Sequence, residues 1–289
     1  MNAVVVYQAN ATCAAEPRPY ALGYTEREFR RLEFQGEFFR DLTEDILRRA
    51  GIAPGMQVLD VGCGVGDVSL LLGRMTGPSG AVLGIDRSQD AIAVARRRAG
   101  AGGFDHLRFE ASEIDAFSAP QPFDAIVGRL VLGYLPDPAA TLKRLAGCLR
   151  PGGILAFQEM AMVQARSVPE GPHFASFSRW MLQTFERAGF EVDMGGKLFG
   201  TFLAAGLPAP QMISAGRVEG SPQSSVYGYL AEVVRSLLPM MERLGVARPA
   251  EVAVDTLTNR LRDEAVANKA SIMLPPLIGA WTRVPLTMN

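Results

Sequence analysis

The chain has 289 residues, a formal net charge of −1, 48% hydrophobic residues and 20% charged residues. This composition is typical of a folded globular protein and excludes disorder as the main state. The balanced charge excludes the basic surface that a phosphate backbone requires, so nucleic acid is not an expected partner.

The cellular compartment is inferred from the cysteines and the apolar stretches. Cys13, Cys63 and Cys148 lack metal-ligand spacing and suit free thiols in a reducing cytosol. The apolar stretches fall short of the roughly 20 residues of a membrane span, and the first residues lack the basic region of a signal peptide. We therefore expect a soluble, cytoplasmic protein without a metal ion and without membrane association.

The first helical pattern lies near the N-terminus. Residues 1–24 read as irregular because Pro17 and Pro19 prevent an early helix. Apolar residues then recur at helical spacing from Thr25, which forms a capping-box pattern with Glu28. Gly51 marks the expected end of this helix.

Short β-type runs alternate with helical segments in the middle of the chain. The predicted strands lie at 57–61, 81–85, 106–110, 123–127 and 153–158, the predicted helices near 66–75, 88–99 and 138–149. Two more strands are expected near 209–218 and 271–284. The pattern predicts an α/β, Rossmann-like fold with a seven-stranded, mostly parallel sheet and helices on both faces.

A helical stretch interrupts the last two predicted strands. Helices are expected at 225–244 and 249–267, and we call residues 221–268 the cap. An insertion there would cover the carboxyl edge of the sheet, where open α/β folds bind ligands. The predicted division is an N-terminal lid segment (1–51), a Rossmann-like core (52–220), the cap (221–268) and the last strand of the core (269–289).

The strongest local signal is the glycine run VLDVGCGVGD at 58–67, between a strand and a helix. Glycines allow a sharp turn and close approach of a ligand. A dinucleotide loop would carry a third glycine at the position of Asp67. Carboxylates at Asp60 and Asp67 disfavour a diphosphate and suit a cation, while Asp86 ends the next strand, where an acid binds ribose hydroxyls. The pattern indicates a cationic adenosine ligand without a diphosphate.

With these motifs the sequence resembles the class I S-adenosylmethionine-dependent methyltransferases, and closely the branch that includes the ubiquinone/menaquinone-biosynthesis C-methyltransferases. The likeness covers roughly residues 20–160. It rests on VLDVGCGVGDVS (58–69), GIDRS (84–88), FEASEI (109–114), FDAIVGRLVLGYLPDP (123–138) and LRPGGILAFQE (149–159). The resemblance implies S-adenosyl-L-methionine as cofactor, with S-adenosyl-L-homocysteine as its product.

The resemblance also implies the residues that contact the cofactor. Gly62 and Gly64 would lie against the methionine, and Ser112 and Glu113 would bracket the adenine, although the family usually carries Asp at position 113. The remaining expected contacts are Asp60, Cys63, Asp67, Asp86, Arg87 and Ile114, the backbone at Gly128 and Arg129, and Arg31 and Gln35 of the lid helix.

Proton-accepting side chains are scarce where the acceptor is expected. Methyl transfer relies largely on orientation, and a base helps only when the acceptor loses a proton. Glu159 ends the fifth strand, while Glu170 and His173 lie on the loop that should border the acceptor. These three are the catalytic candidates. His106 is expected at the far end of the third strand, on the surface.

The acceptor is expected to be small and largely hydrophobic. Phe, Met and Leu crowd the segment after the fifth strand and the cap, and methionine clusters suit pliable apolar pockets. At helical spacing, most of these residues are expected to belong to the hydrophobic core. Candidate substrate contacts are Tyr20, Tyr24, Tyr134, Met160 and Trp180, of which Tyr20 and Tyr24 could equally belong to an aromatic core.

The leading hypothesis is therefore methyl transfer to a natural-product, aromatic or quinone-like molecule. Three alternatives stay open: a nicotinamide-dependent oxidoreductase, a methyltransferase that acts on a macromolecule, and a fold member that binds the cofactor without transferring methyl. The neutral charge argues against the second. The sequence does not decide the atom that is methylated, nor whether the protein forms a homodimer.

Overall fold

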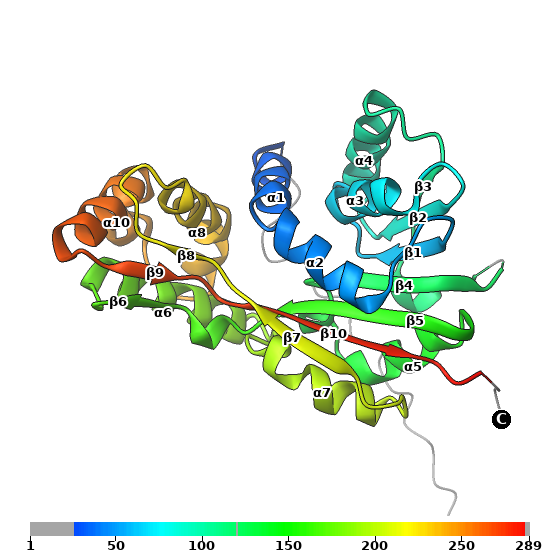
Figure 1. Ribbon diagram of the computed structural model, residues 1–289. Helices are drawn as coiled ribbons and strands as arrows, with labels where there is room; N and C mark the ends of the chain where they lie inside the picture. Colours follow the sequence, from blue (N-terminus) through cyan, green and yellow to red (C-terminus); the bar gives the residue numbers. More distant parts are fainter. Residues whose placement is uncertain (1–25, 120, 287–289) are drawn as a thin grey trace, which may run out of the picture.

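The computed structural model describes residues 26–119 and 121–286 (Figure 1). Its large sheet has the strand order β3-β2-β1-β4-β5-β10-β7. The strands are β1 (Gln57–Val61), β2 (Ala81–Asp86), β3 (Leu107–Ala111), β4 (Phe123–Arg129), β5 (Leu149–Met160), β7 (Gln211–Ala215) and β10 (Leu277–Arg283). β10 runs antiparallel to both neighbours, and the pairs among β1 to β5 are parallel. The predicted seven-stranded, mostly parallel sheet is confirmed.

Helices cover both faces of this sheet. Consecutive residues of each strand point to opposite faces, so Val58 and Ile154 pack on one side while Leu59 and Leu155 pack on the other. The first side carries α2 (Arg40–Ala50), α3 (Asp67–Thr76) and α4 (Gln89–Ala101). The second side carries α5 (Pro138–Ala146) and α7 (Met194–Ala204). This layering places the carboxyl ends of β1, β2, β4 and β5 at one shared edge.

The last two predicted strands are each divided in the structure. The segment 271–284 forms β9 (Ser271–Met273) and β10, separated by Pro275 and Pro276, which lack the N–H that a continuous ladder needs. The segment 209–218 forms β7 and β8 (Val218–Glu219). β8 and β9 join β6 (Arg166–Val168) in a separate three-stranded sheet, which the sequence pattern does not predict.

The N-terminal helical pattern forms two helices instead of one. α1 (Glu26–Phe38) and α2 are separated at Phe39, whose ring is buried and contacts Phe38 edge-on at 5.1 Å. Gly51 ends α2 in the left-handed conformation, as predicted. Thr25, the expected start of the helix, lies outside the described residues.

The cap contains α8 (Val226–Arg243), α9 (Pro249–Val252) and α10 (Val254–Asn268). These helices share one hydrophobic core with α6 (Pro172–Arg187), which follows β5 and lies outside residues 221–268. Phe174, Phe177 and Trp180 of α6 pack with Leu230 and Leu257 of the cap in this core. The segment after β5 is therefore part of the same helical body (Figure 1).

The start of α6 is held by a carboxylate from the cap. Glu264 of α10 accepts the backbone N–H of His173 at 2.7 Å and that of Phe174 at 3.1 Å. A Cβ at Gly171 would lie 2.3 Å from the Glu264 carboxyl carbon, so a side chain at this position would displace the Glu264 carboxylate. The loop before α6 is consequently fixed against α10.

Glu264→Ala should lower the free energy of unfolding by about 1 kcal/mol, because two N–H groups of the first turn lose their acceptor. Urea denaturation monitored by circular dichroism would measure the change. Glu186→Ala, which removes an exposed acid from α6 itself, serves as the matched control. Equal stability of the two variants would contradict the role assigned to Glu264.

Candidate functional site

A cavity of about 290 Å³ opens at the shared carboxyl edge of the sheet. It has a polar end and an apolar end, which differ in the elements that form them. We call the polar end the part lined by Arg31, Gln35, Asp60, Gly62, Cys63, Gly64, Asp67, Asp86, Arg87, Ser112, Glu113, Ile114 and Arg129. We call the apolar end the part lined by Tyr134, Met160, Met162, Met181, Phe185, Phe190, Met194, Tyr229 and Val233. Glu159 also lines the cavity and contacts the loop from which Tyr134 projects.

The glycine run forms a bend that a side chain would obstruct. Gly62 and Gly64 have φ values of 66° and 53°, in the left-handed region that glycine adopts readily. A Cβ at Gly62 would meet Val131 at 2.5 Å. A Cβ at Gly64 would meet no atom within 4 Å, so the backbone there faces open space in the cavity wall. The bend therefore lets a ligand approach the main chain directly.

Asp86 holds this bend from the neighbouring strand. One of its carboxylate oxygens accepts the N–H of Gly64 at 2.9 Å, and the other accepts the N–H of Ser88 at 2.9 Å. Burial raises the pKa of Asp86, although both backbone hydrogen bonds act in the opposite direction. Each oxygen keeps a further lone pair that can accept a hydrogen bond.

Two more carboxylates lie buried or half-buried beside the bend. Ser69 Oγ donates to Asp60 at 2.6 Å, and Arg98 donates to Asp67 at 2.7 Å. Burial raises the pKa of Asp60 to about 7, and it also raises the pKa of Asp67 despite the charge of Arg98. Arg98 and Arg129 offset these buried carboxylates only in part, so a cationic ligand would be stabilised there.

Arg129 and Gly128 end β4 in different surroundings. The Arg129 guanidinium lines the cavity and donates to Thr43 Oγ1 at 3.0 Å, and burial lowers its pKa against the charges of Asp67 and Asp60. Gly128 does not line the cavity, because its Cα faces the ring of Phe157, only 2.5 Å from the place of a Cβ. The expected contact between the Gly128 backbone and a cofactor stays a prediction.

Helix α1 closes the polar end from the outside. Arg31 forms a buried ion pair with Glu28 at 2.6 Å and donates to Gln35 Oε1 at 2.7 Å. Tyr229 of the cap donates to the same oxygen at 3.0 Å. Arg31 and Gln35 line the cavity together with Tyr229, a cap residue that the sequence analysis did not select, and their contact with a cofactor stays a prediction.

Glu159 lies at the end of β5 and is 3% exposed. One carboxylate oxygen accepts the N–H groups of Val131 and Leu132, at 2.8 and 2.7 Å. Burial raises its pKa to about 7, while these backbone hydrogen bonds act in the opposite direction. No ion pair to Glu159 forms among the described residues. A carboxyl with this pKa can exchange a proton near neutral pH.

The other polar groups of the apolar end cannot act as bases near neutral pH. Burial raises the pKa values of Tyr134 and Tyr229, so both hydroxyls keep their protons. Glu191, which also lines the cavity, forms an ion pair with Lys197 at 2.5 Å. Glu159 is therefore the lining carboxyl best suited to accept a proton there.

Several predicted site residues lie away from the cavity. His173 is in the first turn of α6, which packs against Glu264, and Glu170 is exposed on the preceding loop. Trp180 is buried in the core shared by α6 and the cap. These positions correct the expectation that the loop after β5 borders the acceptor. Tyr20 and Tyr24 lie outside the described residues.

His106 precedes β3, at the edge of the sheet opposite the cavity. Its Nε2 lies 3.0 Å from the backbone oxygen of Gly73. The half-buried ring is therefore placed away from the site, as expected.

The described ranges contain no helix of the length and apolarity needed to cross a bilayer. Within the same ranges, no cluster of three or more His, Cys, Asp or Glu side chains is arranged to hold a metal ion.

The fold and the acidic glycine bend together define a Rossmann-like methyltransferase core, and comparison with known proteins agrees. Residues 52–188 match the family model for the methyltransferase domain. The trans-aconitate 2-methyltransferase of Deinococcus radiodurans is 37% identical over 149 residues, which are 51% of this chain and 50% of the relative. The demethylmenaquinone methyltransferase of Anoxybacillus flavithermus is 32% identical over 113 residues, 38% of this chain and 47% of the relative.

The chain thus spans about half the length of these curated relatives. Among solved structures, the [4+2]-cyclase SpnF superposes with a TM-score of 0.52 and 21% identity, over 86% of this chain and 81% of that chain. Residues 52–188 are thus similar to methyltransferase domains, in agreement with the class I S-adenosylmethionine-dependent family that the sequence resembles. This resemblance implies S-adenosylmethionine as cofactor.

Glu159→Gln tests whether Glu159 is protonated in the folded protein. Its folded-state pKa of about 7 exceeds the ordinary value of 4.5, so its contribution to stability is complete below about pH 4.5 and lost as the pH rises through 7. Glutamine can accept the same N–H groups but does not ionise. The free energy of unfolding of the variant minus that of wild type should therefore increase from pH 5 to pH 7, by at most about 1.4 kcal/mol per pH unit.

Urea denaturation at pH 5, 6, 7 and 8 would measure this difference. Asp60, whose pKa is also raised, is present in both proteins and should cancel. A difference that stays constant across the four pH values would contradict the raised pKa of Glu159.

Proposed function

We propose that this protein transfers the methyl group of S-adenosylmethionine to a small, neutral, largely apolar molecule. The observation that carries the proposal is the cavity itself, whose polar end is acidic and whose apolar end is lined by methionine and aromatic side chains. The activity of the whole chain is proposed because the curated relatives are matched over only about half of their length.

The residues of the polar end fit S-adenosylmethionine. The buried or half-buried carboxylates of Asp60, Asp67 and Asp86, with their raised pKa values, favour a ligand that carries an ammonium and a sulfonium. Asp86 would accept the ribose hydroxyls, and Ser112 to Ile114 would bracket the adenine. Gly62, Gly64, Arg129, Arg31 and Gln35 would hold the methionine part. The same charges disfavour the diphosphate of a nicotinamide dinucleotide.

The apolar end supports a neutral acceptor. Its lining includes four methionines, Met160, Met162, Met181 and Met194, whose flexible side chains adapt to irregular apolar shapes. The lining arginines, Arg31, Arg87 and Arg129, come from α1 and from the ends of β2 and β4, all at the polar end. Arg31, whose charge reaches Tyr134 and Tyr229, already forms a buried ion pair with Glu28, so it offers a tricarboxylate such as trans-aconitate a cation that is largely neutralised.

The chain contributes orientation, exclusion of water and a proton acceptor. When bound, the cofactor supplies a methyl group on a positively charged sulfur, which leaves as a neutral thioether. The apolar walls hold the acceptor in line and keep water out, which contributes about 7–11 kcal/mol in well-oriented reactions. The Glu159 carboxylate accepts the proton that a hydroxyl, amine or carbon acid loses, and it later releases that proton to solvent.

A methyl-transfer assay tests this function. Purified protein and isotope-labelled S-adenosylmethionine would be incubated with a panel of neutral phenols and quinols, and with trans-aconitate. Mass spectrometry should find labelled methyl on one or more neutral acceptors and none on trans-aconitate. Glu159→Gln should lower turnover by about 10²–10⁴-fold for an acceptor that loses a proton.

Glu242→Gln, an exposed substitution on α8, is the matched control and should retain wild-type turnover. Methylation of trans-aconitate in preference to the neutral acceptors would overturn the proposed acceptor class. Full turnover of Glu159→Gln would leave orientation alone as the source of catalysis.

A further inference from the structure

Helix α1 lies between two bodies, the core helix α3 on one side and the cap on the other (Figure 1). Its Arg31 and Gln35 line the polar end of the cavity. The position of α1 therefore decides where these two side chains meet a ligand. Both neighbours of α1 are candidates for setting that position.

The contact with the core is close and partly apolar, since Phe29 and Leu32 of α1 pack against Val65, Ala91 and Val94. Gly36 of α1 lies against Asp67, where a Cβ would come within 2.3 Å of the carboxyl carbon. Glu33 approaches Arg98 at 3.8 Å. These contacts place one face of α1 on the start of α3 and beside Arg98 of α4.

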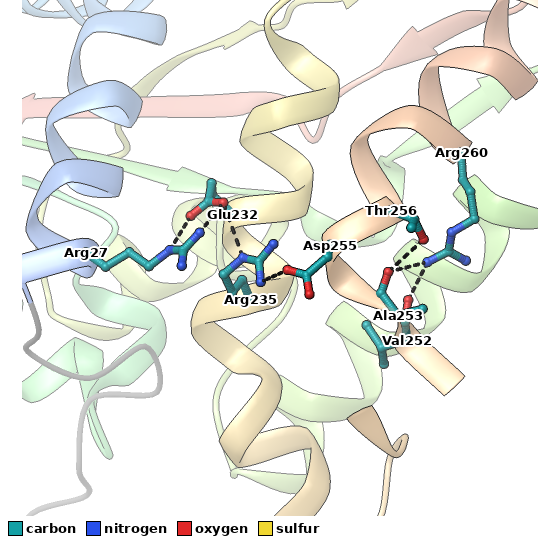
Figure 2. Close-up of polar contacts among 8 residues, drawn as sticks. All are labelled: Arg27, Glu232, Arg235, Val252, Ala253, Asp255, Thr256 and Arg260. Carbon is teal, nitrogen blue, oxygen red and sulfur yellow. Dashed lines mark hydrogen bonds and ion pairs between the residues drawn. The ribbon is translucent and has the colours of Figure 1, made fainter. Parts of the chain in front are cut away.

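The contact with the cap is an ion-pair row that crosses three helices (Figure 2). Arg27 of α1 donates to both carboxylate oxygens of Glu232 on α8, at 2.8 and 2.9 Å. Arg235 of α8 joins Glu232 at 3.4 Å and Asp255 of α10 at 2.6 Å. A bidentate pair fixes direction as well as distance, so α1 is oriented relative to α8.

The turn that begins α10 is itself held in place. Arg260 donates to the backbone oxygens of Val252 and Ala253, and Thr256 Oγ1 donates to Ala253 at 3.0 Å (Figure 2). Asp255 lies within this turn and anchors the outer end of the ion-pair row.

Tyr229 forms a second set of contacts between α1 and α8. Its hydroxyl donates to Gln35 at 3.0 Å, and its ring stacks on Phe34 and Phe38 at 5.8 and 5.4 Å between ring centroids. Tyr229 is one turn before Val233, and both side chains line the apolar end of the cavity. One helix of the cap therefore touches the expected acceptor and also holds the helix that closes the polar end.

We propose that α8 of the cap positions α1 over the cofactor, with Arg27 and Glu232 as positioning residues whose ion pair raises cofactor affinity. This inference rests on the proposed function. It has a consequence for the reaction: an acceptor that orders α8 also strengthens cofactor binding, and by linkage the cofactor strengthens acceptor binding equally.

Calorimetric titration with S-adenosylhomocysteine tests the inference without an acceptor. Arg27→Glu and Glu232→Arg should each weaken affinity by about three- to ten-fold, because like charges then face each other between α1 and α8. The double variant Arg27→Glu/Glu232→Arg should bind more tightly than either single variant, since opposite charges again face each other between α1 and α8, but it should not reach wild-type affinity because Arg235 then faces an arginine. The losses should shrink in 1 M NaCl, where charges are screened beyond about 3 Å.

Arg30→Glu is the matched control, because it makes the same charge change on α1 at an exposed site that pairs only loosely with Glu26, at 3.7 Å. Thermal unfolding would verify that each variant is folded. Single reversals that bind like Arg30→Glu, or a double variant with the summed loss of both singles, would overturn the inference. Absence of binding to the wild-type protein would instead refute the proposed function.

Discussion

The Asp86 carboxylate ties the end of β2 to the glycine bend that follows β1, through the N–H groups of Gly64 and Ser88. These two hydrogen bonds place a carboxylate beside Gly62 and Gly64, where the main chain carries no side chain. Asp60 and Asp67 add two more carboxylates at the same bend, and burial raises the pKa of all three. Their burial opposes folding, and Arg98 and Arg129 offset this cost only in part, so a cationic ligand would stabilise the site further. The chemistry of the cavity follows from this imbalance.

The polar end of the cavity is suited to bind a charged ligand, and the apolar end is suited to enclose a neutral one. Core segments and α1 supply the polar end, while η3 (Met162–Gln164), α6, α7 and α8 contribute most of the apolar lining. Glu159 accepts hydrogen bonds from two backbone N–H groups of the loop after β4. Burial raises its pKa to about 7, so this carboxyl can gain or lose a proton near neutral pH. Its position lets one group support the loop and accept a proton.

Local patterns in the sequence predict the core and its glycine motif well. Gly62, Gly64, Asp60 and Asp86 lie within two consecutive strand-to-helix turns, so their spacing alone indicates a common edge. Predictions that depend on packing between distant segments are weaker. Glu264 lies 91 residues after His173, and no local pattern reveals that it holds the start of α6 away from the cavity.

The same limit applies to helix α1. Its periodicity predicts a helix, but the break at Phe39 depends on tertiary packing. Tyr229 lies 194 residues from Gln35, and its role at the cavity becomes visible only when α8 is placed against α1. The prolines at 275 and 276 are an exception, since they are a local signal for the division between β9 and β10.

The most direct test of the central claim is a calorimetric comparison of S-adenosylhomocysteine and NAD⁺ with the wild-type protein and Asp86→Ala. We expect saturable heat with S-adenosylhomocysteine and none with NAD⁺. Asp86→Ala should lose measurable affinity, because each hydrogen bond to a carboxylate is worth roughly 1.5–3 kcal/mol. Binding of NAD⁺ in place of the nucleoside, or unchanged affinity in Asp86→Ala, would contradict an acidic bend built for a sulfonium nucleoside.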